Sequence, residues 1–134
     1  MSGVFLDAVG LLALWNASDQ WHAAAEKSYR QLIDRNPPFW TTTLVLYECG
    51  NRAARRADFR SLAAAFRDEM DAKGGLIVPT SDDDRSAWNA YERGEAGNAG
   101  IVDHVSFVVM RRLGLTEAFT SDAHFRAAGF TTLF

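Results

Sequence analysis

The stretch Val4-Phe5-Leu6-Asp7 decides the fold of this 134-residue chain, because three apolar residues run directly into one carboxylate. A short apolar run near the N-terminus, bounded by glycine, is typical of a strand buried on both faces. In open α/β sheets the ligand sites lie just beyond the carboxyl ends of the strands, which is where Asp7 would stand. An unpaired carboxylate is costly to bury, so we expect a bound cation and further ligands for it elsewhere in the chain.

The rest of the chain alternates helical patterns with short apolar runs. A helix stopped by Asn36-Pro37-Pro38 is predicted to begin at a cap formed by Ser18 or Asp19. Thr43 is predicted as the N-cap of a helix over 44–56, and Gly74-Gly75 as the end of a helix over 58–73. The other predicted helices are 8–16, 81–93, 101–112 and 122–128. The helix over 81–93 is predicted to begin with a capping box of Ser81 and Asp84. The predicted strands are 4–7, 39–42, 76–79, 118–120 and 130–133.

Strands that alternate with helices imply a parallel sheet with both faces covered. We therefore predict a three-layer α/β/α fold with a central, mostly parallel twisted sheet of four to five strands. The length fits a single domain over residues 1–134, and a hydrophobic content of 48% supports a globular core. Gly94 to Gly100 form a loop of small residues between two of the predicted helices.

Composition narrows the compartment and the partners. Cys49 is the only cysteine, so an intramolecular disulfide is excluded. The N-terminus has no basic region, and Asp7 interrupts its apolar run, so we expect no signal peptide. No apolar stretch approaches the roughly 20 residues of a membrane span, so a cytoplasmic protein without a membrane partner is the default. The net charge of −3 gives no overall attraction to nucleic acid, although arginines can still cluster locally.

Four acids are predicted to meet at one end of the sheet: Asp7, Glu48, Asp103 and Asp122. Mg²⁺ and Mn²⁺ prefer oxygen ligands and take one or two carboxylates each, so such a cluster suits one or two ions. Two ions about 3.5–4 Å apart can activate water and stabilise the leaving oxygen in phosphodiester cleavage. From spacing alone, helix capping and surface charge remain the more common explanation for acids in these places.

Four separated motifs resemble the PIN-domain family, most closely the VapC-type ribonuclease toxins of prokaryotic toxin–antitoxin pairs. They are VFLD at 4–7 with LLALWN at 11–16, TTTLVLYECGN at 41–51, VDHVSFVVMRRLG at 102–114 and AFTSDAHFRAAGF at 118–130. The resemblance covers nearly the whole chain, in order and at suitable spacing. It is specific for the fold and less specific for the biological role.

The resemblance implies that Asp7, Glu48, Asp103 and Asp122 are the four metal-binding acids of the family, in chain order. Such proteins are Mg²⁺- or Mn²⁺-dependent endoribonucleases that hydrolyse RNA phosphodiester bonds with water activated by the divalent metal. They have a doubly wound parallel sheet and often form homodimers, and a small antitoxin protein can block the site. This chain departs from the family pattern at Ala8, where Ser or Thr is usual, and at His104, where a small residue or Cys is common. The segment 97–101 also lacks the hydroxylated and acidic residues often found before the third acid.

Further residues are candidates for supporting the site or touching the substrate. Arg52 begins the densest arginine cluster, one helical turn beyond Glu48, and its planar fork suits phosphate. Thr120 and Ser121 could bind water or phosphate, although a cap on the following helix is the simpler interpretation. His104 and His124 invite a general-base hypothesis, but a two-metal hydrolase needs no such base and we expect a structural role for His124. The complete set of candidate supporting or substrate-contacting residues is Asn51, Arg52, Ser106, Thr120 and Ser121.

Two rival functions remain open. The first is a catalytically silent PIN-fold protein with an RNA-binding or regulatory role. Ala8 favours this alternative, because it lacks the hydroxyl that Ser or Thr would place beside Asp7. A phosphotransferase or receiver with a nucleophilic Asp7 is disfavoured, because haloacid-dehalogenase-like enzymes carry a second Asp two residues later and position 9 is Val9. The triplet Asp82-Asp83-Asp84 is explained by one helix start, and Cys49 by a small buried thiol.

Overall fold

The computed structural model describes residues 3–134, and its centre is a five-stranded sheet in the order β3-β2-β1-β4-β5. Every strand pairing is parallel, and Phe5 of the central strand lies opposite Trp40 on one side and Ala118 on the other. The predicted α/β class and the parallel sheet are confirmed. The strands are β1 (Val4–Leu6), β2 (Phe39–Thr42), β3 (Leu76–Ile77), β4 (Glu117–Phe119) and β5 (Thr131–Thr132).

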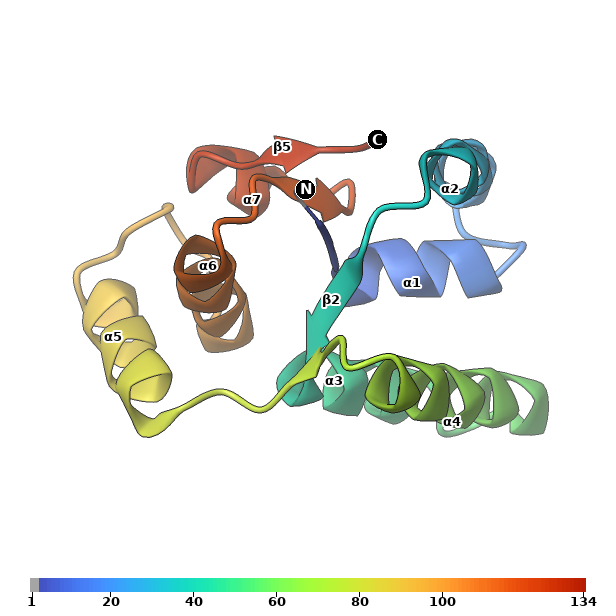
Figure 1. Cartoon of the computed structure of the whole chain (residues 1–134), viewed down its shortest axis with the longest axis horizontal. Coiled ribbons are helices and arrows are strands. Elements are labelled where there is room, and N and C mark those ends of the chain that lie inside the picture. The colour runs from blue at the N-terminus through green and yellow to red at the C-terminus, as the bar shows by residue number, and fades with distance from the viewer. Residues whose placement is uncertain (1–2) are drawn as a thin grey trace.

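The helices cover both faces of this sheet. They are α1 (Ala8–Trp15), α2 (His22–Arg35), α3 (Thr43–Ala53), α4 (Ala57–Ala72), α5 (Ser81–Glu92), α6 (Ile101–Leu113) and α7 (Ala123–Ala127). Figure 1 shows α1, α2 and α4 on one side of the strands and α5 and α6 on the other, which makes the predicted three layers. Helix α3 begins where β2 ends and contacts α1, α4 and α6. Among the described residues, no helix is both long and apolar enough to cross a bilayer.

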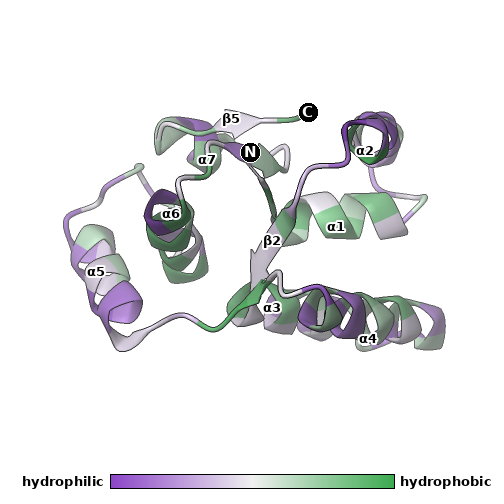
Figure 2. Ribbon diagram, viewed as in Figure 1, coloured by the Kyte–Doolittle hydropathy of each residue, from purple (hydrophilic) through white to green (hydrophobic). Residues whose placement is uncertain are grey.

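Strand β1 is the centre of the hydrophobic core. Val4 and Phe5 are completely buried and Leu6 is 1% exposed, as expected for a strand covered on both faces. The rings of Phe107 on α6 and Phe125 on α7 meet edge to face at 4.9 Å, so the second layer closes over the same core. Figure 2 shows hydrophobic residues concentrated in α1 and α6, whereas α2 and α4 also carry hydrophilic faces.

Several helix starts differ from the sequence predictions by one residue or more. The N-cap of α3 is Thr42, whose hydroxyl accepts from the Val45 amide at 3.2 Å, and not Thr43. Strand β2 runs straight into the helix, so its last extended residue already has the backbone geometry of a cap. Thr80 is likewise the last extended residue before α5, so the capping box of α5 is formed by Thr80 and Asp83, and not by Ser81 and Asp84.

Two other predicted caps were also wrong. Helix α2 has Trp21 as its N-cap, with no side-chain cap, because the Asp19 carboxylate closes the preceding turn by accepting from the Trp21 amide. Helix α7 is capped by the carboxylate of Asp122, and neither Thr120 nor Ser121 fills that role.

An ion pair joins α5 to α6 on the second face of the sheet. Asp83 is 3% exposed, and its two oxygens accept from Nε and Nη2 of Arg112 at 2.9 and 2.7 Å. The hydrogen bond from Arg112, followed by the capping contacts with Thr80, holds the pKa of Asp83 below its ordinary value. The acidic triplet is therefore a helix start, as predicted, but one of its members also fixes the packing of two helices.

The strand order reverses its direction at β1. The chain moves outward from β1 through β2 to β3, then crosses to β4 on the opposite side of β1. Loops therefore diverge at the carboxyl ends of β1 and β4, which is the position where doubly wound sheets bind their ligands. Asp7 follows β1 directly, and Asp122 lies three residues beyond the end of β4.

Candidate active site

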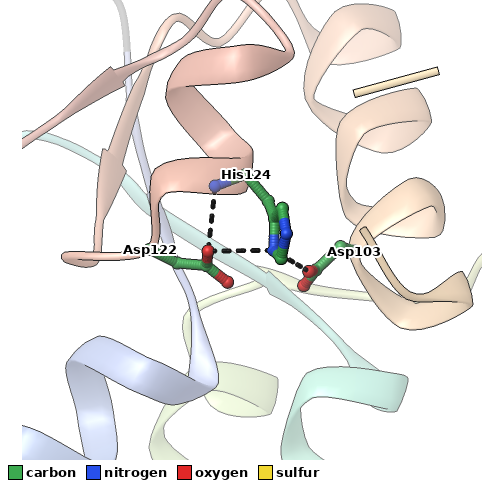
Figure 3. A group of neighbouring side chains, drawn as sticks. All are labelled: Asp103, Asp122 and His124. Atoms are coloured by element: carbon green, nitrogen blue, oxygen red, sulfur yellow. Dashed lines mark hydrogen bonds and ion pairs between the residues drawn. The ribbon is translucent and has the colours of Figure 1, made fainter. Parts of the chain in front are cut away.

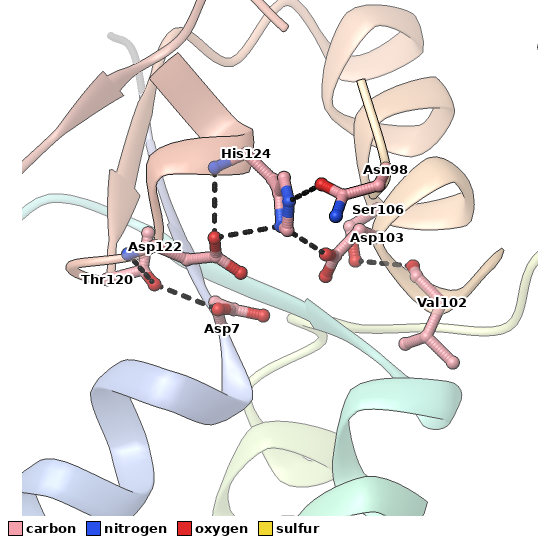
Figure 4. A network of polar contacts seen from close by, with 8 residues as sticks. All are labelled: Asp7, Asn98, Val102, Asp103, Ser106, Thr120, Asp122 and His124. Atoms are coloured by element: carbon pink, nitrogen blue, oxygen red, sulfur yellow. Dashed lines mark hydrogen bonds and ion pairs between the residues drawn. The ribbon is translucent and has the colours of Figure 1, made fainter. Parts of the chain in front are cut away.

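Asp7 is anchored between the two central strands. It stands between β1 and α1 with an extended backbone, and only 2% of it is exposed. The hydroxyl of Thr120, just past β4, donates to Asp7 Oδ2 at 2.9 Å. The same hydroxyl oxygen accepts from the Asp122 amide at 3.1 Å, so one buried threonine links the first and fourth predicted acids (Figure 4).

The electrostatics of Asp7 show that the other acids lie close to it. Its pKa rises from 3.8 to about 7, first because the carboxyl is buried and then because of the negative charges of Asp103, Asp122 and Glu48. The hydrogen bond from Thr120 works in the opposite direction and limits the rise. Without a cation nearby, the ionised form of the Asp7 carboxyl is therefore disfavoured, and a bound cation would stabilise it.

Asp103 and Glu48 complete the cluster from two other helices. Asp103 lies in the first turn of α6, and burial followed by the charges of Asp122 and Glu48 raises its pKa to about 6. Glu48 lies on α3, and its pKa is raised by burial and by the charge of Asp122, while the nearby charge of Arg52 lowers it. The structure thus brings together all four acids from β1, α3, α6 and the start of α7.

His124 lies between two of these acids (Figure 3). Its Nδ1 is 3.1 Å from Asp122 Oδ1 and 3.7 Å from Asp103 Oδ2, and its backbone amide donates to Asp122 Oδ1 at 2.9 Å. The three side chains each offer a ligand atom within 4.8 Å of the others. On the far side of the ring, Nε2 meets Asn98 Oδ1 at 2.8 Å, which ties the glycine-rich loop to the site.

The cluster fits a divalent cation. Asp103 and Asp122 offer ligand atoms close enough to share one ion, and Asp7 and Glu48 lie near enough for their charges to act on the cluster. Among the described residues, none of the four acids forms an ion pair with a lysine or arginine. The pKa values of Asp7 and Asp103 are raised first by burial and then by the negative charges of the neighbouring acids. Oxygen ligands of this number and charge are those that Mg²⁺ and Mn²⁺ prefer.

The predicted supporting residues separate into those near the cluster and those outside it. Thr120 is completely buried and contacts Asp7, whereas Ser121 is half-buried beside it. The Ser106 hydroxyl donates to the Val102 carbonyl one turn back along α6, and not to Asp103. Asn51 is exposed on α3, and within residues 3–134 its side chain has no hydrogen bond to Glu48.

Arg52 lies at the edge of a small surface pocket of about 220 Å³. Its guanidinium is exposed, and it is close enough to Glu48 to lower the pKa of that carboxyl. Two rings, those of Trp15 and Phe59, are also in the wall of this pocket. The arginine cluster consists of Arg52, Arg55, Arg56 and Arg60. Arg56 donates to Asp58 and Arg60 to the Ala54 carbonyl, whereas the charge of Arg52 acts on Glu48.

Sequence reasoning missed the positions of His124 and Asn98. The available signal was the spacing Asp122-x-His124 at a helix start, which places an imidazole over its own capping carboxylate. His104 is 2% exposed against Tyr91 and Phe107 and lies in the core. Cys49 is buried, as predicted, and burial raises the pKa of its thiol to about 12.

Known proteins resemble this chain over almost its full length. The PIN domain family matches residues 4–131. The 23S rRNA-specific endonucleases VapC20 from two strains of Mycobacterium tuberculosis, CDC 1551/Oshkosh and ATCC 25618/H37Rv, are each 31% identical over 127 residues, covering 95% of both chains. The crystal structure of Mycobacterium tuberculosis VapC20, described as a sarcin–ricin loop cleaving toxin, superposes with a TM-score of 0.79 and 31% identity. That alignment covers 96% of this chain and 97% of the other.

The family match, the parallel sheet and the carboxylates at its switch point agree with one another. The chain belongs to the PIN-domain family and is a homologue of the VapC20 endonucleases.

Proposed function

We propose that this protein is a metal-dependent endoribonuclease and the toxin of a toxin–antitoxin pair. The observation that carries the proposal is a group of four carboxylates near the carboxyl ends of β1 and β4, where burial first and the charges of the other three acids second raise the pKa of Asp7 to about 7. A site that concentrates negative charge in this way is suited to cations and to the chemistry of phosphodiesters. The homologous VapC20 proteins bear the name of 23S rRNA-specific endonucleases, which supports RNA as the substrate.

The proposed metal ligands are Asp7, Glu48, Asp103 and Asp122, with Mg²⁺ or Mn²⁺ as the cation. When bound at such a site, divalent ions lower the pKa of the attacking water and stabilise the departing oxygen. The chain itself supplies orientation: Thr120 holds the Asp7 carboxylate toward β4, and Asn98 holds the His124 ring. Arg52 is exposed at the rim of the acids, where its fork can bind a phosphate of the RNA backbone.

The substrate test uses RNA hairpins. The structural relative is described as cleaving the sarcin–ricin loop, so the first substrate is an oligonucleotide with that hairpin, beside a scrambled hairpin of equal length. We expect cleavage with Mn²⁺ or Mg²⁺ and none with a chelator. Asp7→Asn and Asp103→Asn should each lower the rate about 100-fold or more, because metal sites depend steeply on their ligands.

The matched control is Asp34→Asn, which removes one exposed carboxylate on α2, far along the chain from the cluster. It should cleave at the parent rate. Equal cleavage by the parent and Asp7→Asn would refute the metal-ligand role. A folded parent that binds RNA but never cleaves it would support the silent, RNA-binding alternative, for which Ala8 beside Asp7 is the argument.

The proposed partners are a small antitoxin and a second copy of the chain. An exposed apolar surface supports self-association: Val78 is 71% exposed, Trp88 is 49% exposed, and both line a groove of about 670 Å³ between the start of α3 and α5. Large exposed apolar side chains in one place often mark an interface between proteins. Light scattering at several concentrations tests the dimer, and Trp88→Glu should shift the mass toward that of one chain, 14.8 kDa.

A further inference from the structure

His124 is the nitrogen-bearing side chain of the acidic cluster, and its ring points between two carboxylates (Figures 3 and 4). Nδ1 lies 3.1 Å from Asp122 Oδ1 and 3.7 Å from Asp103 Oδ2. Two ligand atoms that each bind one cation at about 2.0–2.2 Å are separated by about 3–4 Å. The separations of 3.1 and 3.7 Å already match those of ligands that share an ion.

The contact with Asn98 determines which nitrogen of the His124 ring carries the proton and which has the free lone pair. The amide oxygen of Asn98 can only accept, and it lies 2.8 Å from Nε2, so Nε2 carries the proton that is donated. In the neutral ring the free lone pair is then on Nδ1, which faces Asp103 and Asp122. A ligating histidine commonly has its outer N–H fixed by an oxygen acceptor in this way.

The loop that carries Asn98 is shaped for this contact. Ala96 and Gly97 both adopt a positive φ, 55° and 67°, immediately before Asn98. The loop then enters α6 at Gly100, three residues before Asp103. One segment therefore presents both a carboxylate of the cluster and the acceptor that orients the histidine.

We propose that Nδ1 of His124 is a direct ligand of a divalent cation that it shares with Asp103 and Asp122, and that this nitrogen makes the site prefer Mn²⁺ over Mg²⁺. The inference rests on the proposed metal-dependent function and names a ligand beyond the four acids. Both ions take oxygen ligands, but Mn²⁺ is a first-row transition ion that also accepts an imidazole nitrogen, whereas Mg²⁺ keeps to carboxylates, phosphates and water. Asn98 is a positioning residue, since it acts through the ring of His124.

The experiment is pulsed electron paramagnetic resonance of Mn²⁺ added to the full-length, metal-free protein. A directly bound imidazole gives a ¹⁴N coupling that carboxylates cannot give. We expect this coupling in the parent and its loss in His124→Gln. It should persist in His22→Gln, a matched control because His22 is half-buried on α2, where its Nδ1 contacts the Ala13 carbonyl.

Metal affinity provides the second readout. Mn²⁺ binding measured by calorimetry should weaken about tenfold in His124→Gln, whereas Mg²⁺ binding should change by less than about threefold, so the preference for Mn²⁺ falls. Asn98→Ala should reduce the preference in the same direction, and Asn98→Asp should restore it because a carboxylate also accepts from Nε2. Loss of both metals to the same extent in His124→Gln would contradict a nitrogen ligand.

A measurement on the unmutated protein avoids any dependence on variant folding. Parent protein grown with ¹⁵N-histidine should replace the ¹⁴N coupling by that of ¹⁵N. If Mn²⁺ binds and supports cleavage but no histidine coupling is found, the inference fails while the proposed function stands. If no Mn²⁺ binds at all, the proposed function itself fails.

Discussion

In the metal-free protein, replacing Asp7 by asparagine should increase stability at neutral and alkaline pH. Asparagine is neutral and nearly isosteric, and its side-chain oxygen can still accept from Thr120, as Asp7 Oδ2 does at 2.9 Å. The substitution removes one charge from a buried position surrounded by Glu48, Asp103 and Asp122. Most substitutions of a buried polar group destabilise, so a gain in stability is a distinctive result.

The sign and magnitude follow from the pKa of Asp7, which the fold raises from 3.8 to about 7. A raised pKa means that the folded state holds the proton more tightly than the unfolded chain. The stability contribution of the protonated group is therefore complete below about pH 4 and is lost as the pH rises through about 7. A difference of about three pH units, at about 1.4 kcal/mol each, corresponds to about 4 kcal/mol at full ionisation. Between about pH 5 and pH 8 the parent should lose about 2–3 kcal/mol of this.

The assay is urea unfolding with a chelator present, repeated across this pH range for the parent, Asp7→Asn and the exposed control Asp34→Asn. We expect the parent and the control to lose stability together as the pH rises, while Asp7→Asn loses much less. Asp103 has a pKa of about 6, so its ionisation causes part of the dependence of stability on pH in all three proteins. Mn²⁺ at 100 times its dissociation constant should narrow the gap, because it stabilises the folded parent by about 2.7 kcal/mol, against the penalty of about 4 kcal/mol at full ionisation.

Two results would refute this reasoning. If Asp7→Asn unfolds at the same urea concentration as the parent at about pH 8 without metal, burial and the neighbouring carboxylates together do not disfavour the ionised form of Asp7. If the variant and the parent show the same pH slope, the charge of Asp7 is not the group that titrates. Either outcome would also remove the main observation behind the proposed cation site.

Three further predictions concern the scaffold. Asp83→Ala should lower the free energy of unfolding by about 2–3 kcal/mol in urea titrations, because it removes a cap of α5 and its contacts with Arg112. The control Asp82→Ala, on the exposed surface, should change the free energy of unfolding by less than about 0.5 kcal/mol. Since the pKa of Asp83 is lowered, its contribution is present above about pH 4 and should be lost at lower pH. Gly10→Ala should destabilise the protein by more than about 3 kcal/mol or prevent folding, since the new Cβ would lie 2.1 Å from the Phe119 carbonyl oxygen. The control Gly50→Ala places its Cβ where no atom lies within 4 Å, and it should stabilise α3 by about 0.5–1 kcal/mol. Cys49 should resist thiol reagents at about pH 8 in the folded protein and react only on unfolding, which thiol titration with and without urea measures.

Local sequence signals predicted most of the architecture, because they act over a few residues. The apolar run before Asp7 predicted the central strand, and Asn36-Pro37-Pro38 and Gly74-Gly75 predicted where two helices end. The helix starts were less predictable, since Thr42 and Thr43 have the same side chain. Only the path of the backbone decides which of them is extended and can cap the helix.

The sequence by itself determined the order of the strands and helices, because hydrophobic periodicity and turn residues are properties of neighbouring positions. It supplied the four candidate acids through the resemblance of its motifs to the PIN-domain family. Only the tertiary structure decided that β4 lies beside β1, which joins Thr120 to Asp7 across 113 positions. The same holds for His124, which reaches Asn98 from 26 positions away and faces Asp103 as well as Asp122. Contacts of this kind depend on how layers pack against one another, and no local pattern of residues encodes the distance between two side chains that the chain brings together only on folding.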